Sequence, residues 1–133
     1  MAAKQRIVHH WQLEVFQLAR EGAQRFFGLS KRFPKEETYS LTDQGRRASR
    51  AVGAMIAEGW RRRKYEAAFV NKLNEAEGEA AETQVWIMHA VDCEYLKKTE
   101  GRELHRLYNR ILGKLVNMGN RPEPWLFRKT ANT

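Results

Sequence analysis

Basic side chains are the residues of this 133-residue sequence whose type and spacing point most directly to chemistry. They form two runs, called here the helix arginines (Arg46, Arg47 and Arg50) and the turn cations (Arg61, Arg62, Arg63 and Lys64). A guanidinium group is planar and always charged, and its N–H groups match the oxygens of a phosphate or a carboxylate. The two runs therefore predict contacts to a phosphate backbone or to an acidic protein.

A run of glutamates supplies the first possible partner within the chain. Residues 74–82 carry four of them on one expected helix: Glu75, Glu77, Glu79 and Glu82. Ion pairs from the helix arginines to these acids, within a chain or between subunits, would fix register more than stability, because an exposed pair contributes about 0–1 kcal/mol. The turn cations have only Glu58 and Glu66 nearby, so they are the main candidates for unpaired positive charge. A solvated charge run is the alternative.

The remaining chemically active residue types lack the spacing that catalysis or metal binding needs. His9 and His10 are adjacent and point in different directions from a helix, and no glutamate stands three residues before His89 or His105. The Glu-x-x-His and His-Glu-x-x-His patterns of helical metal sites are thus absent. No serine lies in a nucleophile elbow, and Cys93 has no evident base partner. We expect no enzyme activity, no metal and no cofactor.

Composition narrows the class of protein. The net charge of +8 lies within residues 1–72, which hold 15 Lys or Arg against 7 Asp or Glu. Such an uneven distribution produces a directed positive field, which attracts polyanions or acidic partners. No stretch approaches the roughly 20 apolar residues that cross a bilayer, and the first residues contain no apolar run of signal-peptide length. Cys93 is the only cysteine, so we expect a reducing, cytoplasmic setting without intrachain disulfides.

Apolar residues recur at steps of three and four through most of the chain, which is the period of amphipathic helices. The pattern predicts one domain, residues 1–133, with helices at about 9–32, 40–59, 64–96 and 100–118 and an irregular tail at 120–133. Pro34 ends the first helix, and Ser40 with Asp43 forms a plausible capping pair for the second. The economical fold is an all-α, up-down antiparallel four-helix bundle.

The second predicted helix has a narrow core face and a basic outer face. At about 100° per residue, one side carries Leu41, Gly45, Ala48, Val52, Ile56 and Gly59. Arg46, Arg50 and Arg61 project from the opposite side, with Ala54 and Ala57 between them. The outer surface is therefore expected to be flat in the middle and edged by guanidinium groups.

The first predicted helix is apolar over two neighbouring stripes, which is wider than one side of a small bundle needs. Such a surface indicates contact with another chain, although deep burial is the alternative. We expect a homo-oligomer whose interface or ion pairs include Phe16, Phe27, Glu79 and Glu82. Tryptophan side chains can also stack on bases, and Trp60 is the candidate because it lies in the basic turn. Burial in the core or in a subunit interface is the better interpretation for Trp11, Trp86 and Trp125.

The segments "RFPKEETYSLTDQGRRA" and "IAEGWRR" resemble the signature of a four-helix bundle family named for proteins encoded in intervening sequences of large-subunit (23S) ribosomal RNA. Matching positions are Phe33, Pro34, Glu37, Tyr39, Leu41, Gln44, Arg46, Arg47, Ala48, Ile56, Ala57, Glu58 and Gly59. A later element matches at Ala76, Gly78 and Glu82. Met55 stands where the family has Asn, and Glu79 where it has Ser, so a charge network is better supported than a shared ligand site.

The resemblance implies a ring-like homopentamer. It also implies relatives among the basic accessory proteins of diversity-generating retroelements, which associate with reverse transcriptase and nucleic acid. Together with the charge pattern, it predicts a non-enzymatic protein that binds nucleic acid, RNA rather than DNA, through arginine–phosphate contacts. The alternative prediction is an interaction scaffold that docks an acidic partner such as a reverse transcriptase.

Overall fold

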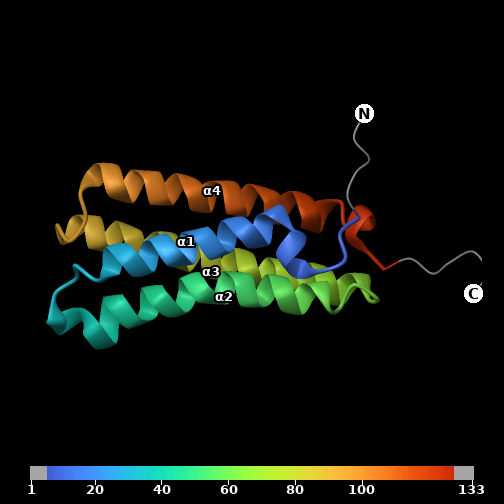
Figure 1. Ribbon diagram of the computed structural model, residues 1–133, viewed down its shortest axis with the longest axis horizontal. Helices are drawn as coiled ribbons and strands as arrows, with labels where there is room; N and C mark the ends of the chain where they lie inside the picture. Colours follow the sequence, from blue (N-terminus) through green and yellow to red (C-terminus); the bar gives the residue numbers. More distant parts are fainter. Residues whose placement is uncertain (1–5, 128–133) are drawn as a thin grey trace, which may run out of the picture.

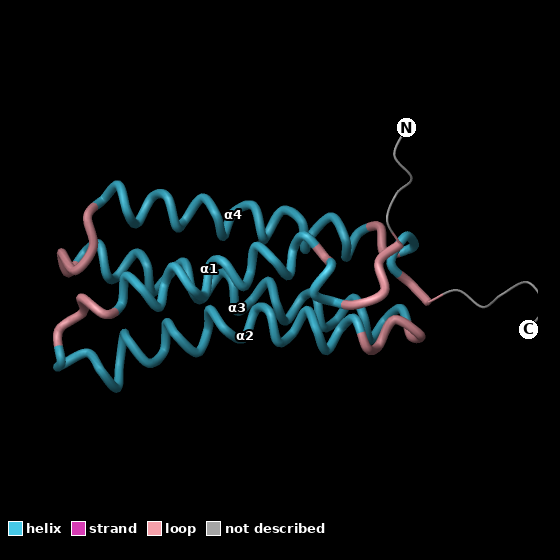
Figure 2. Tube along the Cα trace, in the orientation of Figure 1, coloured by secondary structure: helices cyan, strands magenta, loops and turns pink. Residues whose placement is uncertain are grey.

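The computed structural model describes residues 6–127 and shows four long helices packed side by side (Figure 1). The helices are α1 (Glu14–Ser30), α2 (Asp43–Trp60), α3 (Glu66–Asp92) and α4 (Lys98–Asn120). Consecutive helices are antiparallel neighbours, and α1 also packs against α4 to close the bundle. Residues 6–127 contain no strand, and the connections gather at the two ends (Figure 2). The predicted all-α four-helix bundle is confirmed.

The first helix begins later than predicted because the chain bends at Leu13. This residue is extended, with φ −68° and ψ 129°, and it separates the short 3-10 helix η1 (His10–Gln12) from α1. The side-chain oxygen of Gln12 accepts hydrogen bonds from the backbone N–H groups of Val8 and His9, at 2.8 and 2.9 Å. Residues 8–13 therefore form an ordered turn against the bundle rather than the first turn of one long helix.

The connection between α1 and α2 differs from the predicted capping pair. A 3-10 turn, η2 (Lys35–Glu37), leads into a π turn, η3 (Thr38–Thr42), which passes directly into α2. The Ser40 hydroxyl does not cap α2; it donates a 2.6 Å hydrogen bond to the Glu37 carboxylate. Tyr95 donates to the other Glu37 oxygen at 2.8 Å. Glu37 thus ties the α1–α2 connection to the α3–α4 connection at the same end of the bundle.

The other helix ends lie close to the predicted ones, and their differences have local causes. α3 stops at Asp92, four residues before the predicted end, because Glu94 takes a positive φ of 63° and the Tyr95 N–H returns to the Ala90 carbonyl at 2.8 Å. In the predicted tail, Glu123–Trp125 form the 3-10 helix η4, and residues 128–133 lie outside the described part of the chain.

The core draws on one face of each helix, and the predicted core face of α2 is confirmed. Its buried residues are Leu41, Gly45, Ala48, Val52, Ile56 and Gly59, joined by Ser49 and Trp60. At Gly45 the absence of a side chain lets α1 approach, because a Cβ there would overlap the ring of Phe26. On α1 the buried stripe is Val15, Ala19, Gly22, Phe26 and Ser30, which combines parts of both predicted stripes.

Several apolar side chains remain on the outside of the bundle. Those in the described residues are Val8, Trp11, Tyr39, Tyr65, Val85, Met88, Val116 and Phe127. Trp11, expected in the core or in a subunit interface, is 54% exposed and therefore lies outside the core. Over residues 6–127, none of the helices combines the length and apolar character that crossing a membrane requires.

Candidate nucleic-acid interface

Arg46, predicted to project away from the bundle, instead folds back onto α1. Its Nε donates a 2.8 Å hydrogen bond to the Ser30 hydroxyl, and its guanidinium lies 4.6 Å from the centre of the Phe27 ring. Ser30 in turn donates to the Phe27 carbonyl at 2.8 Å. The side chain is half-buried, so Arg46 is a positioned cation rather than a freely projecting one.

Two further cations lie over the ring of Phe27. Lys31 Nζ lies 4.9 Å and the Arg50 guanidinium 5.5 Å from the ring centre, distances at which a cation is attracted by the ring quadrupole. We call this group the Phe27 cluster: Phe27, Lys31, Arg46 and Arg50. Within residues 6–127 no carboxylate lies at ion-pair distance from its three cations. The cluster therefore concentrates positive charge on the α1–α2 side of the bundle.

The predicted ion pairs between the helix arginines and the glutamates of α3 do not form within the chain. Lys72 takes one of these acids instead, with Nζ 2.8 Å from Glu75, and it also lies 3.0 Å from Glu58 of α2. Glu82 accepts a 3.2 Å hydrogen bond from Trp86 Nε1. Glu75 and Glu82 have these partners because α3 carries its own cation and donor beside them. This leaves the helix arginines without carboxylate partners in the described chain.

Glu79 of α3 lies near enough to Arg47 for the charge of this arginine to affect the pKa of its carboxyl. It is half-buried, and burial, followed by the nearby charge of Glu82, raises its pKa. The charge of Arg47 opposes this by lowering the pKa, although the two side chains form no ion pair within the described residues. Arg47 itself is exposed.

One of the four turn cations is structural rather than free. Arg63 stacks on the Trp60 ring, 3.5 Å from its centre, and its Nε donates to the Trp60 carbonyl at 2.8 Å. The backbone carbonyl of Arg63 accepts the Phe127 N–H at 3.3 Å. Burial, and then repulsion by Arg61, lower the pKa of Arg63. The prediction of a phosphate contact at Arg63 is therefore replaced by a role in holding the C-terminal tail.

Trp60 is likewise withdrawn from solvent. Only 4% of it is exposed, and its indole Nε1 donates a 2.9 Å hydrogen bond to the Val8 carbonyl. One face is covered by Arg63. The interpretation of Trp60 as a base-stacking residue is wrong.

The other turn cations remain open to solvent. Arg61, Arg62 and Lys64 are exposed, and no carboxylate of residues 6–127 lies at ion-pair distance from them. Glu58, predicted to be a neighbour that offsets their charge, points to Lys72 instead. The end of the bundle where α2 passes to α3 therefore carries unpaired positive charge.

A groove between α1 and α2 connects these two basic regions. It has a volume of about 330 Å³ and is lined by Phe16, Ala19, Arg20, Ala23, Gln24, Ser49, Arg50, Gly53, Ala54 and Ala57. Phe16 is half-buried in its wall rather than fully exposed. At 100° per residue, Arg46, Arg50 and Arg61 share the side of α2 that borders the groove. They span about 22 Å along the helix.

We call the resulting surface the basic track. It comprises the groove together with Arg20, Lys31, Arg46, Arg50, Arg61, Arg62 and Lys64. Arg20 and Lys31 come from α1 and its C-terminal end, and sequence reasoning missed both. Their signal was weak because Arg20 is followed by the opposite charge of Glu21 and Lys31 lies just after the first helix, outside both basic runs. Only packing against α2 brings them beside the arginines.

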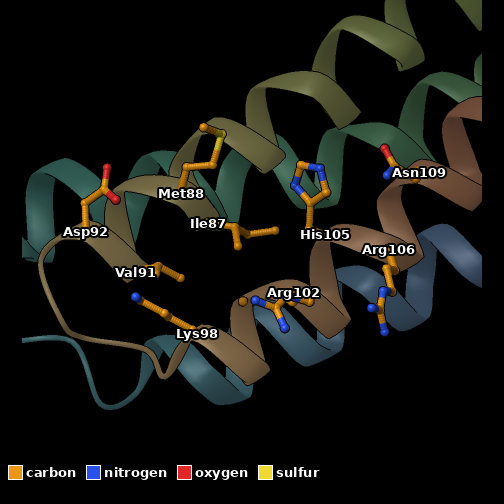
Figure 3. Close-up of a pocket in the computed structure, with 10 residues that line it drawn as sticks. Ile87, Met88, Val91, Asp92, Lys98, Arg102, His105, Arg106 and Asn109 are labelled. Atoms are coloured by element: carbon orange, nitrogen blue, oxygen red, sulfur yellow. The ribbon is translucent and has the colours of Figure 1, made fainter.

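A second groove, between α3 and α4, was also missed (Figure 3). Its volume is about 510 Å³, and its apolar part comprises Ile87, Met88, Val91 and Gly101. α4 contributes polar and basic groups: Lys98, Arg102, His105, Arg106 and Asn109. The spacing of four residues between Lys98, Arg102 and Arg106 was the available signal. Because Met88 is 56% exposed, this groove suits an acidic amphipathic segment better than a bare phosphate backbone.

Residues 6–127 contain no group of three or more His, Cys, Asp or Glu side chains placed to hold a metal ion. Cys93 is a free, exposed thiol at the end of α3. That the chain has no catalytic activity, metal or cofactor stays a prediction.

Comparison with known proteins agrees with the bundle. A family model described as 23S rRNA-intervening sequence protein matches residues 11–117. The chain is also similar to a crystal structure of a protein of unknown function from the S23 ribosomal protein family of Bacteroides thetaiotaomicron. That similarity has 28% identity and a TM-score of 0.71, and covers 78% of this chain and 96% of the other. None of the curated proteins compared matches the chain.

Proposed function

Because the chain belongs to the 23S rRNA-intervening sequence protein family, as its sequence predicted, we propose that it is a non-enzymatic protein that binds nucleic acid, RNA in preference to DNA. The observation that carries the proposal is the basic track, where seven cations lie beside the α1–α2 groove or in the α2–α3 turn without a carboxylate partner in residues 6–127. The cytoplasm is its expected location.

The track suits a phosphodiester strand for two reasons. Its arginines are spread over about 22 Å, so several successive phosphates can be contacted at once. The groove between them is lined by small residues, notably Gly53, Ala54 and Ala57, which let a backbone approach closely. Contacts of this kind fix position and affinity but do not read base sequence.

Salt dependence tests the proposal. If four to six phosphates are neutralised, log K for RNA falls against log salt with a slope of about −3 to −5. Replacing Arg50 and Arg61 together by Ala should weaken binding and reduce the slope by about 2, since each removes one phosphate contact. Fluorescence anisotropy at several salt concentrations measures both quantities.

Arg110 and Lys114 provide the matched control, because both approach Glu14 on the α1–α4 side and their replacement by Ala removes the same net charge. The control variant should bind nearly as the parent does. A slope near zero for the parent, or equal losses in both double variants, contradicts binding on the basic track.

We also propose that the chain assembles with itself, as a pentamer if the family resemblance holds. Support comes from acids that lack a cationic partner within the described residues, Glu79 and Glu82, and from helix arginines that lack an acidic one. Contacts between subunits can satisfy both, with Arg46, Arg47 and Arg50 shared between subunit pairing and phosphate binding. Phe16 and Phe27, each half-buried, are the predicted apolar contacts.

A second candidate function is docking of an acidic protein, for which the family resemblance suggests a reverse transcriptase. The α3–α4 groove favours it, because apolar side chains lie beside Lys98, Arg102 and Arg106, which form no ion pair within residues 6–127 (Figure 3). Replacing Arg102 and Arg106 by Ala should abolish capture of a purified acidic partner and leave RNA binding unchanged. The Arg50 and Arg61 double variant should show the opposite result: weaker RNA binding and unchanged capture of the acidic partner.

A further inference from the structure

Trp11 and His9 form an exposed aromatic pair. Their rings are stacked, with centroids 4.2 Å apart and planes inclined by 8°, and both side chains are open to solvent. Trp11 is 54% exposed, so the pair is accessible to a ligand.

The pair is held in place rather than carried on a loose end. Besides the hydrogen bonds from Val8 and His9 to Gln12, the Gln17 side chain donates to the Trp11 carbonyl at 3.0 Å. The Trp60 indole anchors the same turn through the Val8 carbonyl. Little conformational entropy is therefore lost when a planar ligand stacks on these rings.

The position of the pair links it to the basic track. His10, between the two rings in sequence, packs its edge against Phe16 at 4.8 Å, and Phe16 lines the α1–α2 groove. On the other side, the Val8 contact brings the turn to Trp60, the residue before Arg61. The stacked rings thus lie where the groove meets the turn cations.

We propose that His9 and Trp11 are a stacking platform for an unpaired base of a strand whose phosphates lie on the basic track. This inference rests on the proposed function and narrows its ligand to single-stranded nucleic acid, or to a single-stranded segment of a folded one. Every base has an aromatic face, so stacking needs no particular sequence. In a duplex the bases are stacked on one another and cannot stack on the platform. A duplex would therefore bind without using His9 and Trp11.

The test compares two labelled probes by fluorescence anisotropy at one salt concentration. One is an oligouridylate of roughly 12 nucleotides, within the usual range of single-strand binding sites. The other is the same strand annealed to oligoadenylate. Trp11→Ala should weaken binding of the single strand by about 5- to 150-fold, the range for loss of one stacked base, and change duplex binding less than 3-fold. Trp11→Phe should retain most of the affinity.

Tyr39→Ala is the matched control, because this aromatic residue is 91% exposed at the opposite end of the bundle. It should leave both affinities unchanged. Thermal unfolding followed by circular dichroism checks that each variant keeps the parent's fold, as expected for exposed side chains.

Three results would overturn the platform: equal losses on single strand and duplex, no loss with Trp11→Ala, or a loss accompanied by a smaller assembly in light scattering, which makes Trp11 a subunit contact. Each leaves the parent's salt slope intact. A slope near zero and no effect of Arg50 and Arg61 replacement would instead remove the nucleic-acid proposal itself, so the two failures are distinguishable.

Discussion

Tyr108 places a hydroxyl at the centre of the bundle, among side chains from the three other helices. The hydroxyl lies beside Ser49 and Thr83 and faces Gly22, yet it forms no hydrogen bond of good geometry. Within residues 6–127, no other buried side-chain nitrogen or oxygen lacks a hydrogen-bond partner. Ser49 and Thr83 donate their own protons to carbonyls of their own helices. Burial raises the pKa of Tyr108, which keeps the hydroxyl neutral.

Tyr108→Phe should therefore leave the free energy of unfolding unchanged or increase it by up to about 1 kcal/mol, because the folded state no longer buries a poorly satisfied hydroxyl. Urea denaturation followed by circular dichroism measures the difference. A loss of more than about 1 kcal/mol would mean that the hydroxyl has a partner, such as a bound water.

Arg61 and Arg63 should behave oppositely although they are two residues apart. Arg63→Ala removes the stacking on Trp60 and a backbone hydrogen bond, so we expect a loss of stability of about 1–2 kcal/mol and an unchanged salt slope for RNA. Arg61→Ala should leave stability within about 0.5 kcal/mol and reduce the slope by about 1. Thermal unfolding and the salt titration, run on both variants, separate the two roles; identical profiles would contradict the assignment.

This difference between neighbours shows what the sequence could and could not predict about the site. Charge density predicted where basic residues are concentrated, because it depends only on residue type. The fate of each arginine depends on contacts from far along the chain. The Phe127 N–H donates a hydrogen bond to the Arg63 carbonyl, and the Trp60 indole donates one to the Val8 carbonyl. No local sequence pattern predicts these contacts between distant parts of the chain.

At the scale of elements, the close approach of α1 to α2 depends on the glycine at position 45, where a side chain would meet Phe26. Gly45→Ala forces a Cβ into the Phe26 ring and should lower the free energy of unfolding by about 1–3 kcal/mol, the usual cost of overpacking. Gly53 lies on the groove side, where a Cβ would meet Phe16 at an ordinary contact of 3.4 Å. Gly53→Ala should be neutral or stabilise by up to about 1 kcal/mol, from helix propensity.

Gly113→Ala is a control for propensity alone, because a Cβ at this exposed position of α4 meets nothing within 4 Å. Chemical denaturation measures the free energy of unfolding of the three variants and so ranks their stabilities. If Gly45→Ala is as stable as Gly113→Ala, the close approach of α1 to α2 at Phe26 is not required.

The two loops at the far end of the bundle should respond to pH together. Hydrogen bonds from Ser40 and then Tyr95 lower the pKa of Glu37, so their stabilising effect is present above the ordinary carboxyl value of 4.5 and is lost as pH falls through the folded value. The Glu37 carboxylate raises the pKa of Tyr95 to about 12, so on that side the effect is lost only as pH rises through about 12.

Tyr95→Phe should therefore be less stable than the parent at neutral pH, and the difference should shrink below about pH 4. Melting temperatures of the two proteins between about pH 3 and 8 test this. A difference that does not change with pH would assign the effect of Tyr95 to packing against Phe33 rather than to Glu37.

The helices themselves were predictable, since their apolar period and small-residue face are local properties of the sequence. All six residues predicted for the core face of the second helix are buried, and Ser49 and Trp60 are buried as well. The residues at which the helices begin were harder to predict. The π turn before α2 and the break at Leu13 are set by Glu37 contacting Tyr95 and by residue 8 contacting Trp60, pairs that are distant in sequence.

For the whole molecule, the remaining question is how charges left unpaired in one chain are used. If subunits pair their helix arginines with the acids of α3, light scattering should give a mass about five times the 15.6 kDa of the chain. Arg47→Glu and Glu82→Arg should each reduce this mass, and the double variant should restore it, because the reversed charges attract again. A single-chain mass for the parent contradicts assembly.

Both outermost parts of the described chain, around residues 6 and 127, lie beside the α2–α3 turn (Figure 1). An affinity tag or fluorescent protein fused to either terminus is therefore attached next to the cations that we expect to grip RNA. Cys93, the sole thiol, is exposed at the opposite tip. Maleimide coupling there immobilises or labels the protein at the end of the bundle away from Arg61, Arg62 and Lys64.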